Sequence, residues 1–314
     1  MASPLHPVQG VCPVLETPFT DAGEVDFASF ARLVDHVVRA GIRTVMFPGF
    51  ASEYYKLSDT ERANLTTALL DQVRGLPGFT TVISVPDHST HLAVRRAAAA
   101  VAGGAAAINV LPPHLHAPSG EAVRDHVRAV VAAVAPVPVI LQYAPLQTGT
   151  ALDAAAIARI ARGSPQLVQV KVESTPPGAL ITALGAQDPV LTSVVGYAGV
   201  QLIDALRRGA VGVQPGCSFV EIYRDIWTSW HAGRRDDAIE THRRLLPYIS
   251  YWMQSVELII TVEKRISFRR GLIGSDHCRA PMRRLDPEED AMVERFLGEF
   301  DHELNASRLG STKA

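Results

Sequence analysis

The sequence predicts an α/β protein whose parallel strands close into a (β/α)8 TIM barrel with a C-terminal helical appendage. Short apolar runs alternate with longer amphipathic runs about eight times before residue 233. Strict alternation of this kind implies parallel strands joined by right-handed crossovers, and eight such units can close into a barrel. The length of 314 residues suits one barrel of roughly 250 residues with an addition.

An open doubly wound sheet is the alternative fold. It usually carries a glycine-rich phosphate loop after its first strand, whereas the turn here reads Glu16-Thr17-Pro18-Phe19, so we prefer the closed barrel. We expect strands at 11–18, 44–48, 80–85, 106–111, 137–143, 167–172, 190–195 and 211–214. Helices are expected between them at 27–40, 59–74, 91–102, 120–134, 153–161, 177–184 and 201–208.

Strand signals stop after Gly233, and the remaining chain reads as helices at 236–258, 260–272 and 287–304. The last of these has a good start, because Asp286 can cap it and Pro287 suits its first turn. We therefore predict a catalytic barrel over residues 1–233 and a helical region over 234–314. The polar tail from Asn305 onward is expected to be disordered.

The composition is that of an ordinary globular protein, with 47% hydrophobic residues, 20% charged residues and a net charge of −2. We expect small-molecule partners, because nothing in this charge balance attracts nucleic acid or anionic lipid. Cys12, Cys217 and Cys278 lie far apart, so neither a disulfide framework nor a metal site is expected, and a cytoplasmic location is the simplest reading. We expect no signal peptide and no membrane span.

Lys171 ends an apolar run in a chain with only three other lysines. A strand that carries an amine into a closed interior is unusual, because burying an ammonium is costly. Desolvation favours the neutral amine, which is the form that attacks ketones and builds a Schiff base. The alternative is a strand-end lysine that reaches solvent.

Active sites of such barrels lie at the carboxyl ends of the strands. Glu173 lies two residues after Lys171, on the same face of the strand, and could accept a proton; its alternative role is a structural salt bridge. We expect catalysis from Lys171, Gln142 and Glu173. The residues expected to contact substrate at the other strand ends are Phe50, Ala51, Ser52, His114, Tyr143, Gly196 and Gln214.

Several ordered motifs resemble the dihydrodipicolinate synthase and N-acetylneuraminate lyase family of class I aldolases, over about residues 9 to 300. They are Thr17-Pro18-Phe19, Gly49 to Glu53, Thr148-Gly149, Lys171, Gly196 and Arg279-Ala280-Pro281. The resemblance implies that Lys171 forms an imine with a pyruvate-type 2-oxo acid and that Gly196 leaves room for substrate. It also implies a homo-oligomer, a dimer or tetramer, without metal or cofactor.

The departures from the family pattern are informative. Gln142 stands where the family usually carries a catalytic tyrosine, and Tyr143, its neighbour, should face the opposite side of the strand. Phe50 and Ala51 replace two threonines. Gln147 stands where synthases acting on aspartate semialdehyde carry an arginine, so we do not expect a lysine-pathway synthase.

A branch of the family that includes L-2-keto-3-deoxyarabinonate dehydratase resembles the chain more closely at these points, in Gln-x-Ala-Pro from Gln142 and Lys-x-Glu from Lys171. Three hypotheses follow. The first is a Schiff-base lyase of the aldolase type acting on a 2-oxo acid. The second is a 2-keto-3-deoxy sugar acid dehydratase, and the third is a catalytically reduced binding barrel.

Overall fold

The computed structural model describes residues 7–149, 151–187 and 191–310. The chain forms two compact units, which are described separately. The first comprises Met1–Cys12, Thr44–Phe47 and Val73–Gln214, and the second comprises Pro13–Arg43, Pro48–Gln72 and Pro215–Ala314. All eight strands belong to the first unit.

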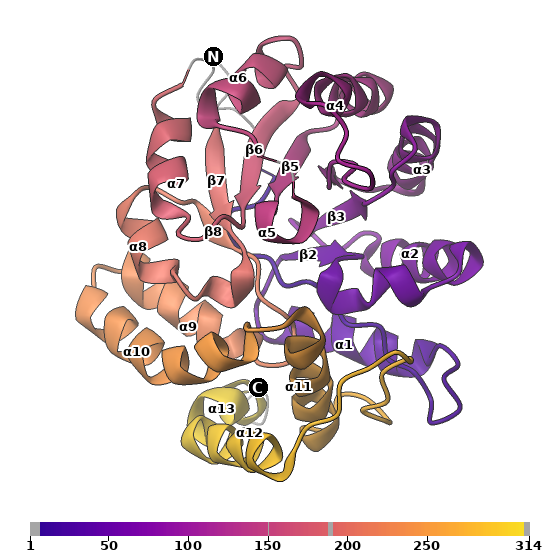
Figure 1. The fold of residues 1–314 in the computed structure, drawn as a ribbon. Coiled ribbons are helices and arrows are strands. Elements are labelled where there is room, and N and C mark those ends of the chain that lie inside the picture. The colour runs from indigo at the N-terminus through magenta and orange to yellow at the C-terminus, as the bar shows by residue number, and fades with distance from the viewer. Residues whose placement is uncertain (1–6, 150, 188–190, 311–314) are drawn as a thin grey trace. The chain divides into compact units, whose positions relative to one another are not determined.

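The eight strands form one parallel sheet in the order β1-β8-β7-β6-β5-β4-β3-β2, a nearly closed (β/α)8 barrel (Figure 1). The predicted fold class is therefore confirmed. The strands are β1 Gly10–Val11, β2 Thr44–Phe47, β3 Thr80–Val85, β4 Ala107–Val110, β5 Val139–Tyr143, β6 Leu167–Val172, β7 Thr192–Val195 and β8 Gly212–Val213.

The pairing of β5 with β6 sets the geometry at the centre of the first unit. The register is irregular between Val139 and Ile140, and beyond that point Gln142 lies opposite Lys171 and Tyr143 opposite Val172. Residues paired in this way point to the same side of a sheet, and their chain neighbours point to the other. Gln142 and Lys171 therefore share one face.

The helices of the first unit lie along the outside of its strands (Figure 1). Ser119 caps α4 by accepting a hydrogen bond from the backbone of Ala122, and the apolar positions Val123, Val127 and Val130 are buried at helical spacing. The helices are α3 Thr90–Gly103, α4 Gly120–Val134, α5 Pro145–Thr148, α6 Ala154–Arg162, α7 Gly178–Gly185, η3 Tyr197–Gly199 and α8 Leu202–Arg207.

The second unit is helical, and an aromatic cluster forms part of its core. The ring of Phe296 lies 5.0 Å from that of Phe219 and 5.2 Å from that of Trp252, in edge-on arrangements that aromatic pairs prefer. The elements are α1 Phe27–Arg39, η1 Phe50–Ser52, η2 Tyr54–Lys56, α2 Asp59–Val73, α9 Val220–His231, α10 Arg235–Trp252, α11 Val256–Arg269, α12 Pro287–Glu299 and α13 Asp301–Gly310.

Three expected elements differ in extent. The first strand is short, and after Val11 the predicted strand continues only as an isolated bridge from Val14 to Gly216. The helix predicted over 236–258 is two helices, because Ser255 adopts an extended backbone between α10 and α11. The expected tail continues as α13, where Asn305 Nδ2 donates to Asp301 Oδ1 at 2.8 Å; residues 311–314 lie outside the described range, as does Val190.

None of the helices in the described ranges combines the length and apolar character needed to cross a membrane. The division into a catalytic barrel through residue 233 and a helical region after it stays a prediction.

Candidate active site

Lys171 lies one residue before the end of β6 and is only 4% exposed. Its Nζ lies 3.3 Å from Oε1 of Glu173, which follows the same strand and is 8% exposed. The spacing of two residues brings both groups to one face, as the sequence predicts. A buried amine and a buried carboxylate therefore meet at the carboxyl end of β6, where barrel enzymes carry out their chemistry.

Gln142 links this pair to a line of buried polar side chains. Its Nε2 donates to Oε2 of Glu173 at 2.7 Å, and its Oε1 accepts from Nδ2 of Asn109 at 2.9 Å. The same Nδ2 donates to Oγ of Ser84 at 2.8 Å. Strands β3 to β6 each contribute to this line, because their register brings the polar positions together. Such a network holds each member in one orientation.

Asn109 and Ser84 were missed in the sequence analysis, although a signal for each exists. Asn109 interrupts the apolar strand Ala107–Val110, and Ser84 interrupts Thr80–Val85. A polar residue within a buried parallel strand needs a hydrogen-bond partner, so its presence indicates a polar interior.

Gly196, directly after β7, makes room for Glu173. A Cβ atom at this position would lie 2.4 Å from Oε1 of Glu173 and 2.7 Å from its Cδ. Any other residue would displace the carboxylate from Lys171. The resemblance implied that this glycine leaves space for substrate; in the structure the space is taken by the Glu173 side chain.

Tyr143 was predicted to contact substrate, and its position on the strand disfavours that role. Its side chain points to the face opposite Gln142, and its hydroxyl accepts a hydrogen bond from the backbone of Leu152 at 3.1 Å, just before α6. The register irregularity at Val139 precedes this point and does not turn Tyr143 inward. We therefore do not assign Tyr143 to the site.

Gln214, directly after β8, is buried beside two sulfur atoms. Its Nε2 lies 3.4 Å from Sγ of Cys12 and 3.5 Å from Sδ of Met46, and its Oε1 is buried with no hydrogen-bond partner in the described residues. Burial raises the pKa of the Cys12 thiol to about 12, with smaller opposing effects from Gln214 and Lys171. Cys12 is therefore protonated and does not compete with Lys171 as a nucleophile.

His114 pairs with a histidine that the sequence analysis did not select. Its ring lies 4.4 Å from that of His88, and its backbone N–H donates to Nδ1 of His88 at 3.2 Å. Burial, and then the charge of His114, lower the pKa of His88. The two rings connect the loops after β3 and β4, and no contact between either ring and Lys171 is found in the described residues.

Phe50, Ala51 and Ser52 form η1 in the second unit. The Ser52 hydroxyl donates to the carbonyl of Leu15 at 2.5 Å and accepts from the backbone of Gly49 at 2.9 Å. This hydroxyl closes its own loop and ties it to the segment at Leu15. The contact of these three residues with substrate stays a prediction.

Within the described ranges, no group of three or more His, Cys, Asp or Glu side chains is placed to hold a metal ion. The groups at Lys171 are an amine, a carboxylate and an amide. An amine can form an imine with a carbonyl compound, a carboxylate can move a proton, and an amide can orient both by hydrogen bonds.

Comparisons with known proteins agree with this geometry. A model of the "Dihydrodipicolinate synthetase family" matches residues 7–299. The chain is 31% identical over 299 residues to an L-2-keto-3-deoxyarabonate dehydratase from Azospirillum brasilense, covering 92% of this chain and 93% of that protein. It is 28% identical over 297 residues to 4-hydroxy-tetrahydrodipicolinate synthase 1 from Streptomyces coelicolor, covering 93% of this chain and 94% of that protein. The crystal structure of a dihydrodipicolinate synthase from Rhodopseudomonas palustris superimposes on this chain with a TM-score of 0.86 at 27% sequence identity. The match covers 94% of this chain and 98% of that one.

Proposed function

Because the chain belongs to the dihydrodipicolinate synthetase family, whose members are lyases, we propose that it removes water from a 2-keto-3-deoxy sugar acid through an imine on Lys171. The observation that carries the proposal is the buried contact between Lys171 Nζ and Glu173 Oε1 at 3.3 Å. It puts a proton acceptor beside the atom that would bond to the substrate.

The chemistry begins with attack of Lys171 Nζ on the 2-oxo carbon and loss of one water, which leaves an iminium. The iminium draws electrons and makes the C3 protons acidic. C3 is two bonds from the imine nitrogen, so a carboxylate held beside Nζ can reach it. Glu173 takes a C3 proton, an enamine forms, and the enamine expels the C4 hydroxyl as water when Glu173 returns its proton. Transfer of a C5 proton to C3 then leaves an enol at C4 and C5, which tautomerises to an aldehyde, and hydrolysis of the imine releases the 2-oxo acid semialdehyde.

Gln142 favours this reaction over carbon–carbon cleavage. Aldol cleavage needs a base on the C4 hydroxyl, whereas the amide of Gln142 can only donate and accept hydrogen bonds. Its contact with Glu173 at 2.7 Å instead orients the carboxylate that acts at C3. The likeness to the Azospirillum dehydratase supports the same choice. This order reverses that of the sequence analysis, which placed the aldolase-type lyase first.

The aldolase-type lyase is the second candidate, and Glu173 also favours it. Cleavage between C3 and C4 leaves a pyruvate enamine, which must be protonated at C3 before release. A protonated Glu173 beside Nζ can supply that proton. The two reactions therefore share Lys171 and Glu173 and differ in the group that acts on the C4 oxygen.

Covalent capture tests the imine. Borohydride added to the protein with pyruvate or a 2-keto-3-deoxy sugar acid is expected to add the mass of the reduced ligand to the Lys171 peptide. Absence of an adduct across a broad panel of 2-oxo acids would leave the binding barrel as the better account. An adduct of equal yield on Lys171→Ala would place the imine elsewhere.

Product analysis separates the two lyases. A 2-keto-3-deoxy pentonate is expected to give a dehydrated 2-oxo acid semialdehyde, without pyruvate. Release of pyruvate and an aldehyde would instead identify the aldolase. Efficient condensation of pyruvate with aspartate semialdehyde would restore the synthase, which Gln147 disfavours because it lacks the guanidinium that binds a carboxylate. A homo-oligomer, a cytoplasmic location and catalysis without metal or cofactor stay predictions.

A further inference from the structure

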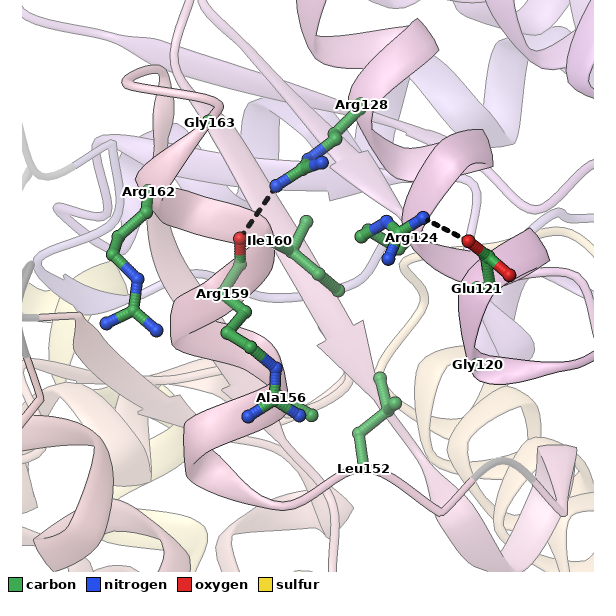
Figure 2. Close-up of a pocket in the computed structure, with 10 residues that line it drawn as sticks. All are labelled: Gly120, Glu121, Arg124, Arg128, Leu152, Ala156, Arg159, Ile160, Arg162 and Gly163. Atoms are coloured by element: carbon green, nitrogen blue, oxygen red, sulfur yellow. Dashed lines mark hydrogen bonds and ion pairs between the residues drawn. The ribbon is translucent and has the colours of Figure 1, made fainter.

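A basic groove lies between α4 and α6 of the first unit, away from the residues assigned to catalysis. Its volume is about 620 Å³, which is in the range of small-molecule sites. Arg124 and Arg128 project from α4 and Arg159 from the facing α6, with Arg162 further along that helix (Figure 2). We call this feature the arginine groove.

The charges that line the arginine groove do not cancel. Its lining holds four arginines and one glutamate, a net charge of +3. Arg124 is already paired, because it donates to Oε1 of Glu121 at 3.0 Å and to Oδ1 of Asp125, outside the lining, at 3.1 Å. No hydrogen bond or ion pair to the Arg159 side chain is found in the described residues. Clustering like charges is unfavourable unless an anion compensates them.

Arg128 is held in place for such a role. It donates to the backbone carbonyl of Arg159 at 2.8 Å (Figure 2), and its Nε is buried with no hydrogen-bond partner in the described residues. The guanidinium lies against Gly163, where a Cβ atom would come within 3.0 Å of Nη2 and 3.1 Å of Cζ. The absence of a side chain at Gly163 thus allows the position of Arg128.

We propose that the arginine groove binds a small oxyanion with two or more negative charges, carried by phosphoryl or carboxyl groups. Arginine forks match both kinds of oxygen geometry and bind them through paired hydrogen bonds. The first turn of α4 adds to the positive potential, because Gly120 and Glu121 at the start of that helix line the same groove. The buried Nε of Arg128 and the Arg159 guanidinium supply the unused donors.

Calorimetric titration of the full chain at low salt tests the proposal, with inorganic pyrophosphate and citrate as separate probes and acetate as the monovalent control. We expect saturable binding of at least one probe and none of acetate. Tight binding of pyrophosphate alone identifies a phosphoryl ligand, tight binding of citrate alone a carboxyl ligand, and binding of both a site that accepts either. No saturable binding of either probe at millimolar concentration refutes the proposal.

Three variants and a matched control distinguish a built site from a diffuse basic surface. Arg128→Gln and Arg159→Gln are each expected to weaken binding about tenfold or more. Gly163→Ala keeps every charge but puts a methyl group about 3.0 Å from Nη2 of Arg128, so the guanidinium must shift by a few tenths of an ångström; we expect a weaker loss of affinity than for Arg128→Gln. Arg207→Gln, which removes an exposed arginine at the end of α8, should leave binding unchanged.

The comparison of Arg159→Gln with Arg207→Gln decides between the two accounts. If Arg207→Gln loses as much affinity as Arg159→Gln, the groove is only an electrostatic surface and the proposal fails. Arg159 is exposed, so Arg159→Gln keeps the test valid even if Arg128→Gln does not fold. Circular dichroism establishes which variants are folded.

Discussion

In the part of the chain that the structure describes, each unit buries a lysine against a glutamate, and the two pairs are built differently. In the second unit Lys264 donates to Oε1 of Glu53 and, at 3.0 Å, to the carbonyl of His277, and its Nζ lies 4.2 Å from the centre of the Phe19 ring. In the first unit Lys171 has a single ion-pair partner in the described residues, Glu173 at 3.3 Å.

The partners of the two carboxylates differ in the same way. Glu53 also accepts from Lys56 at 3.1 Å and from the backbone of Arg279 at 3.2 Å. Glu173 accepts from the Gln142 amide, which leaves Oε1 directed at the amine. A saturated pair holds segments together, whereas an amine with unused bonding capacity is suited to react.

The largest expected effect comes from Lys171→Ala. It should reduce turnover on the order of 10⁴-fold or more, because the imine cannot form. Borohydride capture on the Lys171 peptide should disappear, while the circular dichroism spectrum remains that of the parent. Steady-state rates and mass spectrometry measure the two effects. A variant that keeps a tenth of the parent rate would remove Lys171 from the mechanism.

Glu173→Gln should separate imine formation from proton transfer. We expect a loss of turnover of roughly 10²–10⁴-fold, since the amide cannot accept the C3 proton, while borohydride capture persists. Solvent deuterium exchange at C3 of bound pyruvate, followed by NMR, should slow in parallel. Normal exchange in this variant would show that another base acts at C3.

Lys264→Met should affect stability rather than chemistry. Removing this cation leaves the buried Glu53 with fewer partners, so the free energy of unfolding should fall by about 3 kcal/mol. Urea unfolding measures the loss, and capture at Lys171 should continue in the folded fraction. If Lys264→Met is as stable as the parent, the contrast between a structural and a reactive pair is wrong.

Gln142→Ala should have a smaller effect on rate, because the amide orients Glu173 without exchanging protons. A tenfold to hundredfold loss of turnover is expected, roughly that of removing one positioning hydrogen bond. Gln142→Tyr offers a sharper comparison, since it restores the family's usual hydroxyl. If the dehydratase assignment is correct, this variant should gain a detectable release of pyruvate.

The smallest expected effect is on the pH dependence of stability, and it concerns Glu16 and Glu263 of the second unit. Unlike Glu53, neither forms an ion pair with a buried lysine in the described residues. Burial is the main cause that raises the pKa of Glu16 to about 7 and that of Glu263 to about 8, and repulsion from Glu16 contributes to the latter. The folded state therefore holds protons that the unfolded chain releases above about pH 4.5. Stability should therefore fall as the pH rises from about 4.5 to about 8 and should level off above that, where both states have lost these protons.

Glu16→Gln should flatten this dependence by roughly 1–2 kcal/mol between pH 5.5 and 8.5, because it removes one titrating acid and its repulsion of Glu263. Urea unfolding at several pH values gives the two curves. Parallel curves for the parent and Glu16→Gln would mean that the buried acids do not control stability in this range.

Much of the fold was determined by local sequence alone. Alternating apolar and amphipathic runs predicted seven of the eight strands within a few residues, since each strand and helix of a (β/α)8 barrel has its own period. Only the first strand was misjudged, because its apolar run extends beyond the two residues that pair with β8. The helix start predicted at Asp286 is also confirmed, because capping depends only on residues that are adjacent in the sequence.

In the candidate site, too, some residues could be predicted from the sequence and others could not. Lys171 and Glu173 could be found from the sequence, because their spacing on one strand puts them on one face. The partners of Asn109 and the role of Gly196 could not, since they depend on which residues of different strands lie side by side. Gln142 and Glu173 are 31 residues apart and meet only through the register of β5 and β6.

The arginine groove is the clearest case of a feature that tertiary structure alone decided. In the sequence its arginines are ordinary polar positions on two separate amphipathic helices. Packing α4 beside α6 brings them to one surface, and Gly163 at the end of α6 admits the guanidinium of Arg128. Sequence patterns determine which face of a helix is buried, because burial follows the helical period. Which helix lies opposite, and at what height, is decided by strand order and register across the whole sheet.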